Sequence, residues 1–262
     1  MNILDTIIAK KRIEVAERKQ EMPISRLEQK KAFKKPAISF TEFLLRNDKN
    51  GIIAEFKKQS PSKGIINATA TAKEITKAYT QYGASAISVL TDESFFGGSL
   101  EDLTDSIENE IPVLRKDFII DEYQLTESKA FGASVILLIA ACLSKEEVKN
   151  LSSSAKKLGL SVLLEIHNEK EVEHICEDVD VVGVNNRDLK TFTVDVNCSI
   201  ELSNRIPADK LKISESGIDN VATIKLLQQY GYNGFLIGEK FMKEKDPAGA
   251  FKFFAEELNL TK

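Results

Sequence analysis

Lysine, glutamate and asparagine side chains directly follow short apolar runs at several places in this sequence. The residues concerned are Glu55, Lys57, Arg115, Lys116, Asp117, Glu165, Asn185, Arg187 and Glu215. Carboxylates and amines held close together are the groups that transfer protons to and from a substrate. A structural ion pair would explain any one of these residues equally well. It explains the whole set poorly, because burying ionised groups costs on the order of several kcal/mol unless they are paired or used.

Eight short runs of aliphatic and β-branched residues are predicted to be the strands that carry these side chains. The runs lie at 52–56, 86–90, 112–114, 135–138, 162–165, 181–184, 212–214 and 235–237. Each run is apolar almost throughout, which is typical of parallel strands buried on both faces. A spacing of about 25 residues leaves room for one helix between consecutive strands.

Glycines and capping residues predict where the intervening helices begin and end. Four glycines stand just before predicted strands, where a helix closes with a left-handed residue. They are Gly83, Gly132, Gly159 and Gly231. Three pairs have the spacing of a capping box, in which side chains satisfy the free amides of a first turn. They are Thr71 with Glu74, Ser144 with Glu147 and Asn168 with Glu171.

Eight such strand and helix units predict a closed parallel (β/α)₈ barrel of the α/β class. Barrels of this kind commonly take about 250 residues as one domain, so the 262 residues fit a single domain over 1–262. The alternative on pattern alone is a doubly wound open sheet, which usually stops at about five or six strands. In a barrel, the polar residues above would converge at one end, because the strands' carboxyl ends meet there.

Two loops after the seventh and eighth runs each contain a glycine, in Ser216-Gly217 and in Gly238-Glu239. Barrels frequently bind phosphate at this pair of loops through backbone amides and a short helix start. A single glycine there often marks only a tight turn. Because both loops have one, the sequence indicates a phosphorylated small substrate.

Residues 1–46 precede the repeat and are predicted to form a helical extension of the barrel. Ile3, Leu4, Ile7 and Ile8 favour a helix that ends before Pro23. Two more capping boxes, Ser25 with Glu28 and Ser39 with Glu42, predict two short helices. The extension is interpretable either as a solvated basic segment or as a lid packed across one barrel end, and the sequence leaves both interpretations open.

The composition excludes several classes of partner. A net charge of −4 with 29% well-mixed charged residues gives no basic surface for nucleic acid. The longest apolar run, 132–143, is shorter than the roughly 20 residues of a membrane helix, and the first residues lack the order of a secretory signal. Three widely spaced cysteines without a CxxC motif predict neither disulfides nor a metal site, and fit a reducing cytoplasm. We therefore expect a soluble cytoplasmic protein that is a monomer.

Several stretches occur in the order in which one enzyme family has them, and the chain resembles the indole-3-glycerol-phosphate synthases of tryptophan biosynthesis. The stretches are IAEFKKQSPSKG at 53–64, LTD at 90–92, PVLRKDF at 112–118, GVNNRDL at 183–189, ISESGI at 213–218 and IGE at 237–239. The resemblance extends over almost the whole chain, including the N-terminal helical extension. Asn168 stands where the family often has aspartate, and Lys240 adds a cation beside the proposed phosphate site.

The resemblance implies a lyase that needs no cofactor. Its reaction would convert 1-(2-carboxyphenylamino)-1-deoxyribulose 5-phosphate to indole-3-glycerol phosphate with loss of carbon dioxide and water. Ring closure needs an acid at the ribulose carbonyl, for which we select Lys116, with Glu55 as its partner. Glu165 and Lys57 would handle the later proton transfers. Asn185 and Glu215 would orient the substrate hydroxyls.

The remaining groups of such a substrate are a benzoate and a phosphate. Ser60 and Arg187 are candidates for the carboxylate, since arginine suits planar two-point recognition. The aromatic ring would lie against Pro61, Phe96 and Phe118, although core packing is the ordinary role of any single phenylalanine. The phosphate would be bound by the backbone amides of Ser216, Gly217, Gly238 and Glu239 together with Lys57.

Two other functions fit the same residues. Lys116 or Lys57 would be the nucleophile of a Schiff-base lyase or isomerase that also binds phosphate. Alternatively, the charged ring would only hold a metabolite in a noncatalytic barrel. We expect His167 and His174 to lie at the surface or behind the residues that contact substrate, and the cysteines to be inert core residues.

Overall fold

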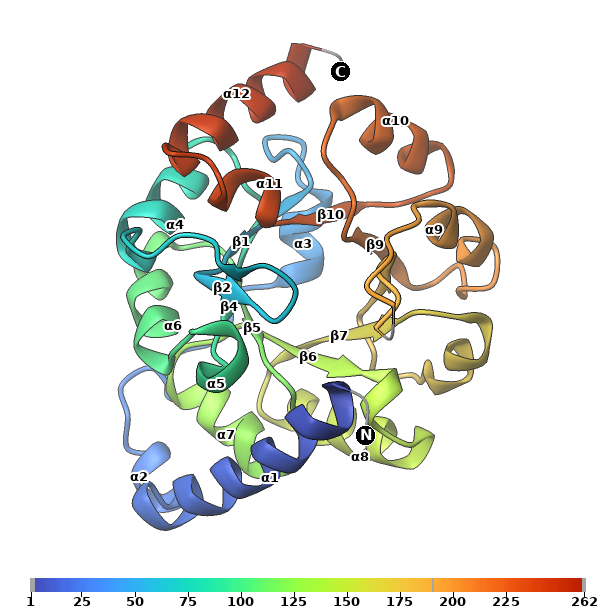
Figure 1. The fold of residues 1–262 in the computed structure, drawn as a ribbon. Helices are drawn as coiled ribbons and strands as arrows, with labels where there is room; N and C mark the ends of the chain where they lie inside the picture. Colours follow the sequence, from blue (N-terminus) through green and yellow to red (C-terminus); the bar gives the residue numbers. More distant parts are fainter. Residues whose placement is uncertain (1–2, 190, 261–262) are drawn as a thin grey trace.

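The computed structural model describes residues 3–189 and 191–260, and their strands close into a barrel (Figure 1). Among these residues eight parallel strands form the barrel: β1 (Ile52–Phe56), β4 (Ala86–Leu90), β5 (Val113–Lys116), β6 (Val135–Ile139), β7 (Ser161–Ile166), β8 (Val181–Asn185), β9 (Leu211–Glu215) and β10 (Gly234–Ile237). Pairing of β10 with β1 closes the ring, with Phe235 opposite Ile52. The barrel prediction is confirmed, and the open-sheet alternative is wrong.

Helices surround the barrel in the order that the sequence predicts. They are α4 (Ala72–Gln81), α5 (Glu93–Phe96), α6 (Leu100–Ser106), α7 (Glu122–Ala130), α8 (Lys145–Lys157), α9 (Asn197–Leu202), α10 (Val221–Gln229), α11 (Glu239–Met242) and α12 (Pro247–Leu260), with 3₁₀ turns η1 (Ile107–Asn109), η2 (Ala140–Cys142) and η3 (Glu169–His174). Thr71, Ser144 and Asn168 cap helices as expected. No helix in the described part of the chain is long and apolar enough to cross a membrane.

The core has two layers because successive side chains of a strand point to opposite faces. One layer, between strands and helices, includes Ile52, Ala54 and Phe56 of β1. The other fills the barrel interior and includes Ile53 of β1 and Leu114 of β5. Residues two positions after Ile53 and Leu114 therefore point into the same interior, nearer the carboxyl end.

The N-terminal extension contacts both ends of the barrel. Helix α1 (Ile3–Glu21) runs along the outside beside α7, and its first residues reach the mouth (Figure 1). Helix α3 (Phe40–Leu45) contributes Phe40 and Leu44 to the interior layer, and Leu44 lies close to Gly234 at the start of β10. The interpretation as a solvated extension is wrong, because these apolar side chains are buried.

One of the two predicted caps in the extension is correct. Ser39 caps α3 by accepting a hydrogen bond from the Glu42 amide. Ser25 is not a cap, since α2 (Ile24–Leu27) begins one residue earlier, directly after Pro23. Proline suits a helix start because its fixed φ is compatible with the first turn and its missing N–H is not needed there.

Candidate active site

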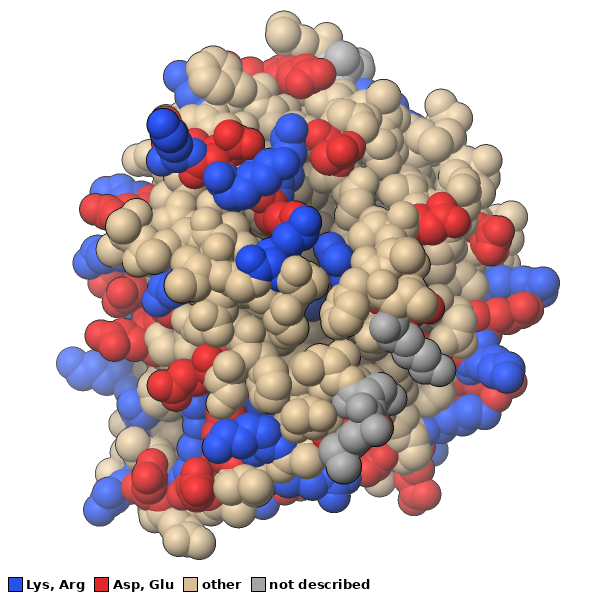
Figure 2. Space-filling view, in the orientation of Figure 1, with Lys and Arg blue, Asp and Glu red and all other residues tan. Residues whose placement is uncertain are grey.

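A cavity of about 550 Å³ opens at the carboxyl ends of the strands, and the residues predicted for the site line it. They are Glu55, Lys57, Ser60, Pro61, Phe96, Lys116, Phe118, Glu165, Asn185, Arg187, Glu215, Ser216, Gly217, Gly238 and Glu239. Figure 2 shows the mouth as a hollow near the centre of this face, bordered by lysine and arginine side chains. Its volume is in the range of small-molecule sites.

Alternation along the strands places the charged side chains in this cavity. Ile53 is followed two residues later by Glu55, Leu114 by Lys116, Leu163 by Glu165 and Ile213 by Glu215. The first residue of each pair belongs to the interior core layer. Because side chains two positions apart share a face, the second residue projects into the cavity above that layer.

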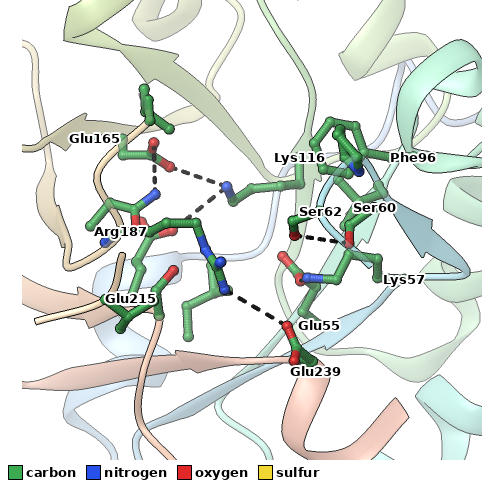
Figure 3. Close-up of a pocket in the computed structure, with 18 of the residues that line it drawn as sticks. Glu55, Lys57, Ser60, Ser62, Phe96, Lys116, Glu165, Arg187, Glu215 and Glu239 are labelled. Atoms are coloured by element: carbon green, nitrogen blue, oxygen red, sulfur yellow. Dashed lines mark hydrogen bonds and ion pairs between the residues drawn. The ribbon is translucent and has the colours of Figure 1, made fainter. Parts of the chain in front are cut away.

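Lys116 lies between two glutamates, Glu165 of β7 and Glu215 of β9. Its Nζ is 3.1 Å from Oε2 of Glu165 and 3.6 Å from Oε2 of Glu215 (Figure 3). Burial lowers the pKa of the Lys116 ammonium, but the carboxylates of Glu165, Glu215 and Glu55 outweigh burial and raise that pKa above its ordinary value. Lys116 therefore keeps its proton at neutral pH.

Glu165 is surrounded by donors. Asn185 Nδ2 donates to its Oε1 at 3.1 Å, and His167 Nε2 lies 3.2 Å from the same oxygen. Burial raises the pKa of Glu165, but Lys116 and His167 lower it by more than burial raises it. The pKa of Glu165 is therefore well below its ordinary value. Glu165 is consequently a carboxylate at neutral pH, able to accept a proton.

His167 lies behind Glu165. Of the two positions expected for it, at the surface or behind the residues that contact substrate, the structure shows the second. Its ring Nδ1 is 3.1 Å from Oε2 of Glu171, and its backbone N–H donates to the same oxygen at 2.7 Å. Burial lowers the pKa of His167, but its two glutamate partners raise it to about 10. A protonated His167 adds a second positive charge beside Glu165.

Glu215 has few partners in comparison with Glu165. Its Oε1 has no hydrogen-bond partner among the described residues. Burial and the carboxylates of Glu165 and Glu55 raise the pKa of Glu215 above its ordinary value, against the lowering effect of Lys116. Gly183 on β8 leaves room for this side chain, because a Cβ there would overlap Glu215 Oε1. Glu215 is thus a buried carboxyl group with free hydrogen-bonding capacity.

Glu55 pairs with a lysine other than the one expected. Its Oε1 accepts a hydrogen bond from Lys57 Nζ at 2.6 Å, whereas the ion pairs of Lys116 are with Glu165 and Glu215. Glu55 forms no ion pair with Lys116 among those of the described residues, although its charge contributes to the raised pKa of Lys116. A glycine is needed at position 238 beside the Glu55 side chain, since a Cβ there would lie 2.6 Å from Glu55 Oε1.

An aromatic wall and a small hairpin form another side of the cavity. The rings of Phe96 and Phe118 have centroids 6.1 Å apart, and both line the cavity rather than being fully buried in the core. Strands β2 (Gln59–Ser60) and β3 (Gly64–Ile65) pair as an antiparallel hairpin. The hairpin presents Ser60 and Pro61 to the cavity.

The two glycine-bearing loops meet at the upper edge of the cavity. Ser216 and Gly217 have φ of 67° and 74°, and Gly238 precedes the short helix α11. Arg187 Nη2 is 3.7 Å from Glu239 Oε2, and Lys63 Nζ is 3.8 Å from Glu239 Oε1. Arg187 thus lies against the loop proposed for phosphate.

Some cavity residues were not predicted from the sequence. Phe192 and Val194, from the loop after β8, line the cavity. Ile3, Leu4 and Ile7 of α1 also line it, as the interpretation of the extension as a lid across one barrel end expected. Phe192 has a φ of 59°, which no local sequence signal indicated.

Comparison with known proteins gives consistent matches over the chain. The family model described as indole-3-glycerol phosphate synthase matches residues 4–254. The indole-3-glycerol phosphate synthase of Bacteroides thetaiotaomicron is 46% identical over 258 residues, covering 98% of this chain and 99% of that protein. The protein of the same name from a Polaromonas species is 39% identical, with 95% and 96% coverage.

Solved structures with low sequence identity share the fold. The 3-hexulose-6-phosphate synthase from Salmonella typhimurium superposes with a TM-score of 0.62 at 13% identity, covering 81% of this chain and all of that chain. The tryptophan synthase α-subunit from Legionella pneumophila gives 0.61, also at 13% identity, covering 84% of this chain and 97% of that chain. At such identities the likeness concerns the barrel alone.

Proposed function

Because this chain belongs to the indole-3-glycerol-phosphate synthase family, we propose that it converts 1-(2-carboxyphenylamino)-1-deoxyribulose 5-phosphate to indole-3-glycerol phosphate. A carbon–carbon bond forms between the ring carbon that bears the carboxylate and the ribulose carbonyl carbon. Carbon dioxide then leaves and the ring regains aromaticity, and loss of water completes the indole. The observation that carries this proposal is the Lys116 ammonium between Glu165 and Glu215 in the cavity.

Lys116 is the general acid of ring closure. Its raised pKa keeps a proton and a positive charge where negative charge develops on the carbonyl oxygen. The same protonation supports a lyase without a Schiff base, because an amine needs a free electron pair to attack a carbonyl.

Glu165 and Lys57 take part in the proton transfers of dehydration. Glu165 is ionised and faces the cavity, so it accepts a proton from the intermediate. Lys57, held by Glu55 on the opposite side, assists departure of the hydroxyl group. Figure 3 shows the two side chains on opposite sides of the cavity.

The rest of the substrate matches the remaining walls. Ser60 and Arg187 bind the carboxylate, and the benzene ring lies against Pro61, Phe96 and Phe118. Asn185 and Glu215 hold the sugar hydroxyls, for which the unpartnered Oε1 of Glu215 is available. The amides at Ser216, Gly217, Gly238 and Glu239, with Lys57, bind the phosphate. We further propose a cytoplasmic monomer with one domain, 1–262, that includes the extension 1–46.

Indole fluorescence tests the activity directly. The protein has no tryptophan, so product formed from the aminodeoxyribulose phosphate is observed against a low background. We expect many turnovers for each protein molecule. Binding without turnover would indicate a noncatalytic barrel, and borohydride inactivation in the presence of substrate would indicate a Schiff-base enzyme.

A further inference from the structure

A lysine occupies the middle of the buried face of helix α1. The buried residues of this helix are Ile7, Lys11 and Val15, spaced four apart so that they share one face. Lys11 is 1% exposed, although it stands between two apolar positions. A buried ammonium is costly unless carboxylates surround it, so its partners decide what it does.

Three carboxylates meet the Lys11 ammonium. Nζ is 2.9 Å from Oδ2 of Asp92, 2.9 Å from Oδ1 of Asp117 and 2.8 Å from Oε2 of Glu14. Burial lowers the pKa of Lys11, but Asp117, Asp92 and Glu14 outweigh burial and raise the pKa above its ordinary value. Lys11 is therefore a permanent cation that joins two separate loops of the barrel to α1.

Each of the two aspartates fixes backbone next to a cavity residue. Asp92 caps helix α5 by accepting a hydrogen bond from the Phe95 amide at 2.8 Å, and the next residue is Phe96. Asp117 accepts a hydrogen bond from the Phe118 amide at 2.8 Å and directly follows Lys116. The Lys11 ammonium thus contacts the two carboxylates that fix the backbone beside Phe96, beside Phe118 and at the end of β5.

We propose that Lys11 is a positioning residue, whose contacts with Asp92 and Asp117 couple docking of helix α1 to the placement of Phe96, Lys116 and Phe118. The role of Lys11 in turnover rests on the proposed function, whereas the coupling itself does not. Alternation along β5 explains how a residue outside the barrel reaches the interior site: Lys116 points inward, and its neighbour Asp117 points outward to Lys11. Lys11 itself does not line the cavity.

Lys19 offers a matched control on the same helix. It also joins α1 to the barrel, through a 2.7 Å ion pair with Asp121, the cap of α7. This pair is partly exposed, and Asp121 is not next to a cavity residue. Replacing Lys19 weakens a contact of α1 but leaves in place the hydrogen bonds of Asp92 and Asp117 to the Phe95 and Phe118 amides.

The test compares Lys11→Met with Lys19→Met by steady-state kinetics and by amide hydrogen exchange of Phe95 and Phe118. For Lys11→Met we expect kcat to fall by about tenfold to a hundredfold at a temperature well below its Tm, since small displacements of catalytic groups have effects of this size. Both amides should exchange faster in Lys11→Met. Lys19→Met should match the wild type in kcat and in both exchange rates.

A double variant separates positioning from simple charge balance. Lys11→Met with Asp92→Asn leaves no unpaired carboxylate at 92, while asparagine still caps α5. We expect its Tm to recover towards wild type and its kcat to stay low. Recovery of kcat together with Tm would overturn the proposal, as would unchanged kcat and exchange in a folded Lys11→Met.

The same double variant decides the matter if the single variant does not fold. Unchanged amide exchange in it would overturn the coupling even for an enzyme without the proposed activity. An inactive wild type with faster exchange in the variants would instead contradict the proposed function while supporting the coupling.

Discussion

Strand β5 contributes to two buried clusters of charge, one on each of its faces. The inner cluster consists of Glu55, Lys57, Lys116, Glu165, His167 and Glu215 around the cavity. The outer cluster consists of Lys11, Glu14, Arg18, Asp92, Arg115, Asp117 and Glu127 beneath helix α1. Both combine basic side chains with carboxylates, so the presence of paired charges alone does not separate a site from a structural network.

Hydrogen bonding separates the two clusters. Each nitrogen of the Arg115 guanidinium has a partner, among them Asp117, Glu127, Thr91 and the backbone of Gln124. In the inner cluster Glu215 Oε1 lacks a hydrogen bond within the described structure, and the cavity lies beside it. A satisfied network stabilises the fold, whereas unsatisfied polar atoms beside a cavity are available to a ligand.

The largest effect should come from removing the central cation of the inner cluster. Lys116→Ala should lower kcat by about two to four orders of magnitude, the scale of a lost general acid. Lys57→Ala should raise KM more than Lys116→Ala does, because Lys57 lies beside the proposed phosphate loops. Steady-state kinetics with circular dichroism checks both. Near-normal kcat in the Lys116 variant and its loss in the Lys57 variant would assign the acid to Lys57.

Removing the central cation of the outer cluster should affect stability instead. Arg115→Met leaves Asp117 and Glu127 each with one fewer cation in a buried place, which costs about 3–5 kcal/mol of unfolding free energy. Urea denaturation measures this. Arg46→Met is the matched control, because Arg46 and Asp48 have the same spacing and a similar distance at the exposed surface, and should change little. Equal effects would remove the distinction between the sites.

His167 provides a pH test of the inner cluster. Its pKa rises from the ordinary 6.5 to about 10 on folding, so its protonated form stabilises the fold fully below pH 6.5 and loses this effect as pH rises towards 10. His167→Gln should lower the unfolding free energy by about 1.5–3 kcal/mol at pH 6, the scale of a hydrogen bond to a charged group. The difference in Tm from wild type should shrink up to pH 10. A constant difference would contradict the assigned charge of His167.

The smallest effect should follow loss of the apolar start of α1. A variant that begins at Ala9 lacks the residues that line the cavity but keeps Lys11 and the outer cluster. We expect KM to rise about tenfold, equivalent to about 1.4 kcal/mol of binding, with kcat close to wild type. An unchanged KM would show that α1 contributes only through Lys11. Deletion of all of 1–46 is not informative, since Phe40 and Leu44 fill the barrel interior.

The sequence predicted the members of the site better than their pairing. Side-chain alternation along a strand is a local rule, so the sequence alone could place Glu55, Lys116, Glu165 and Glu215 at the mouth of the barrel. Which glutamate meets Lys116 depends on how β7 and β9 are placed relative to β5 in the closed barrel, and no local rule contains that distance. Ser216 shows the same limit, since its left-handed φ of 67° was not indicated by its residue type.

Eight apolar runs at regular spacing, closed by glycines, determined the barrel by themselves, because each unit can bury its strand only by pairing with neighbours. Tertiary structure alone decided where the N-terminal extension packs and which charges are satisfied. Lys11 looked like one surface lysine among many, and only the nearby Asp92 and Asp117 make its burial favourable. The physical reason is distance along the chain: strand periodicity is encoded within a few residues, whereas an ion pair between residues 11 and 117 exists only when helix α1 packs beside the end of β5.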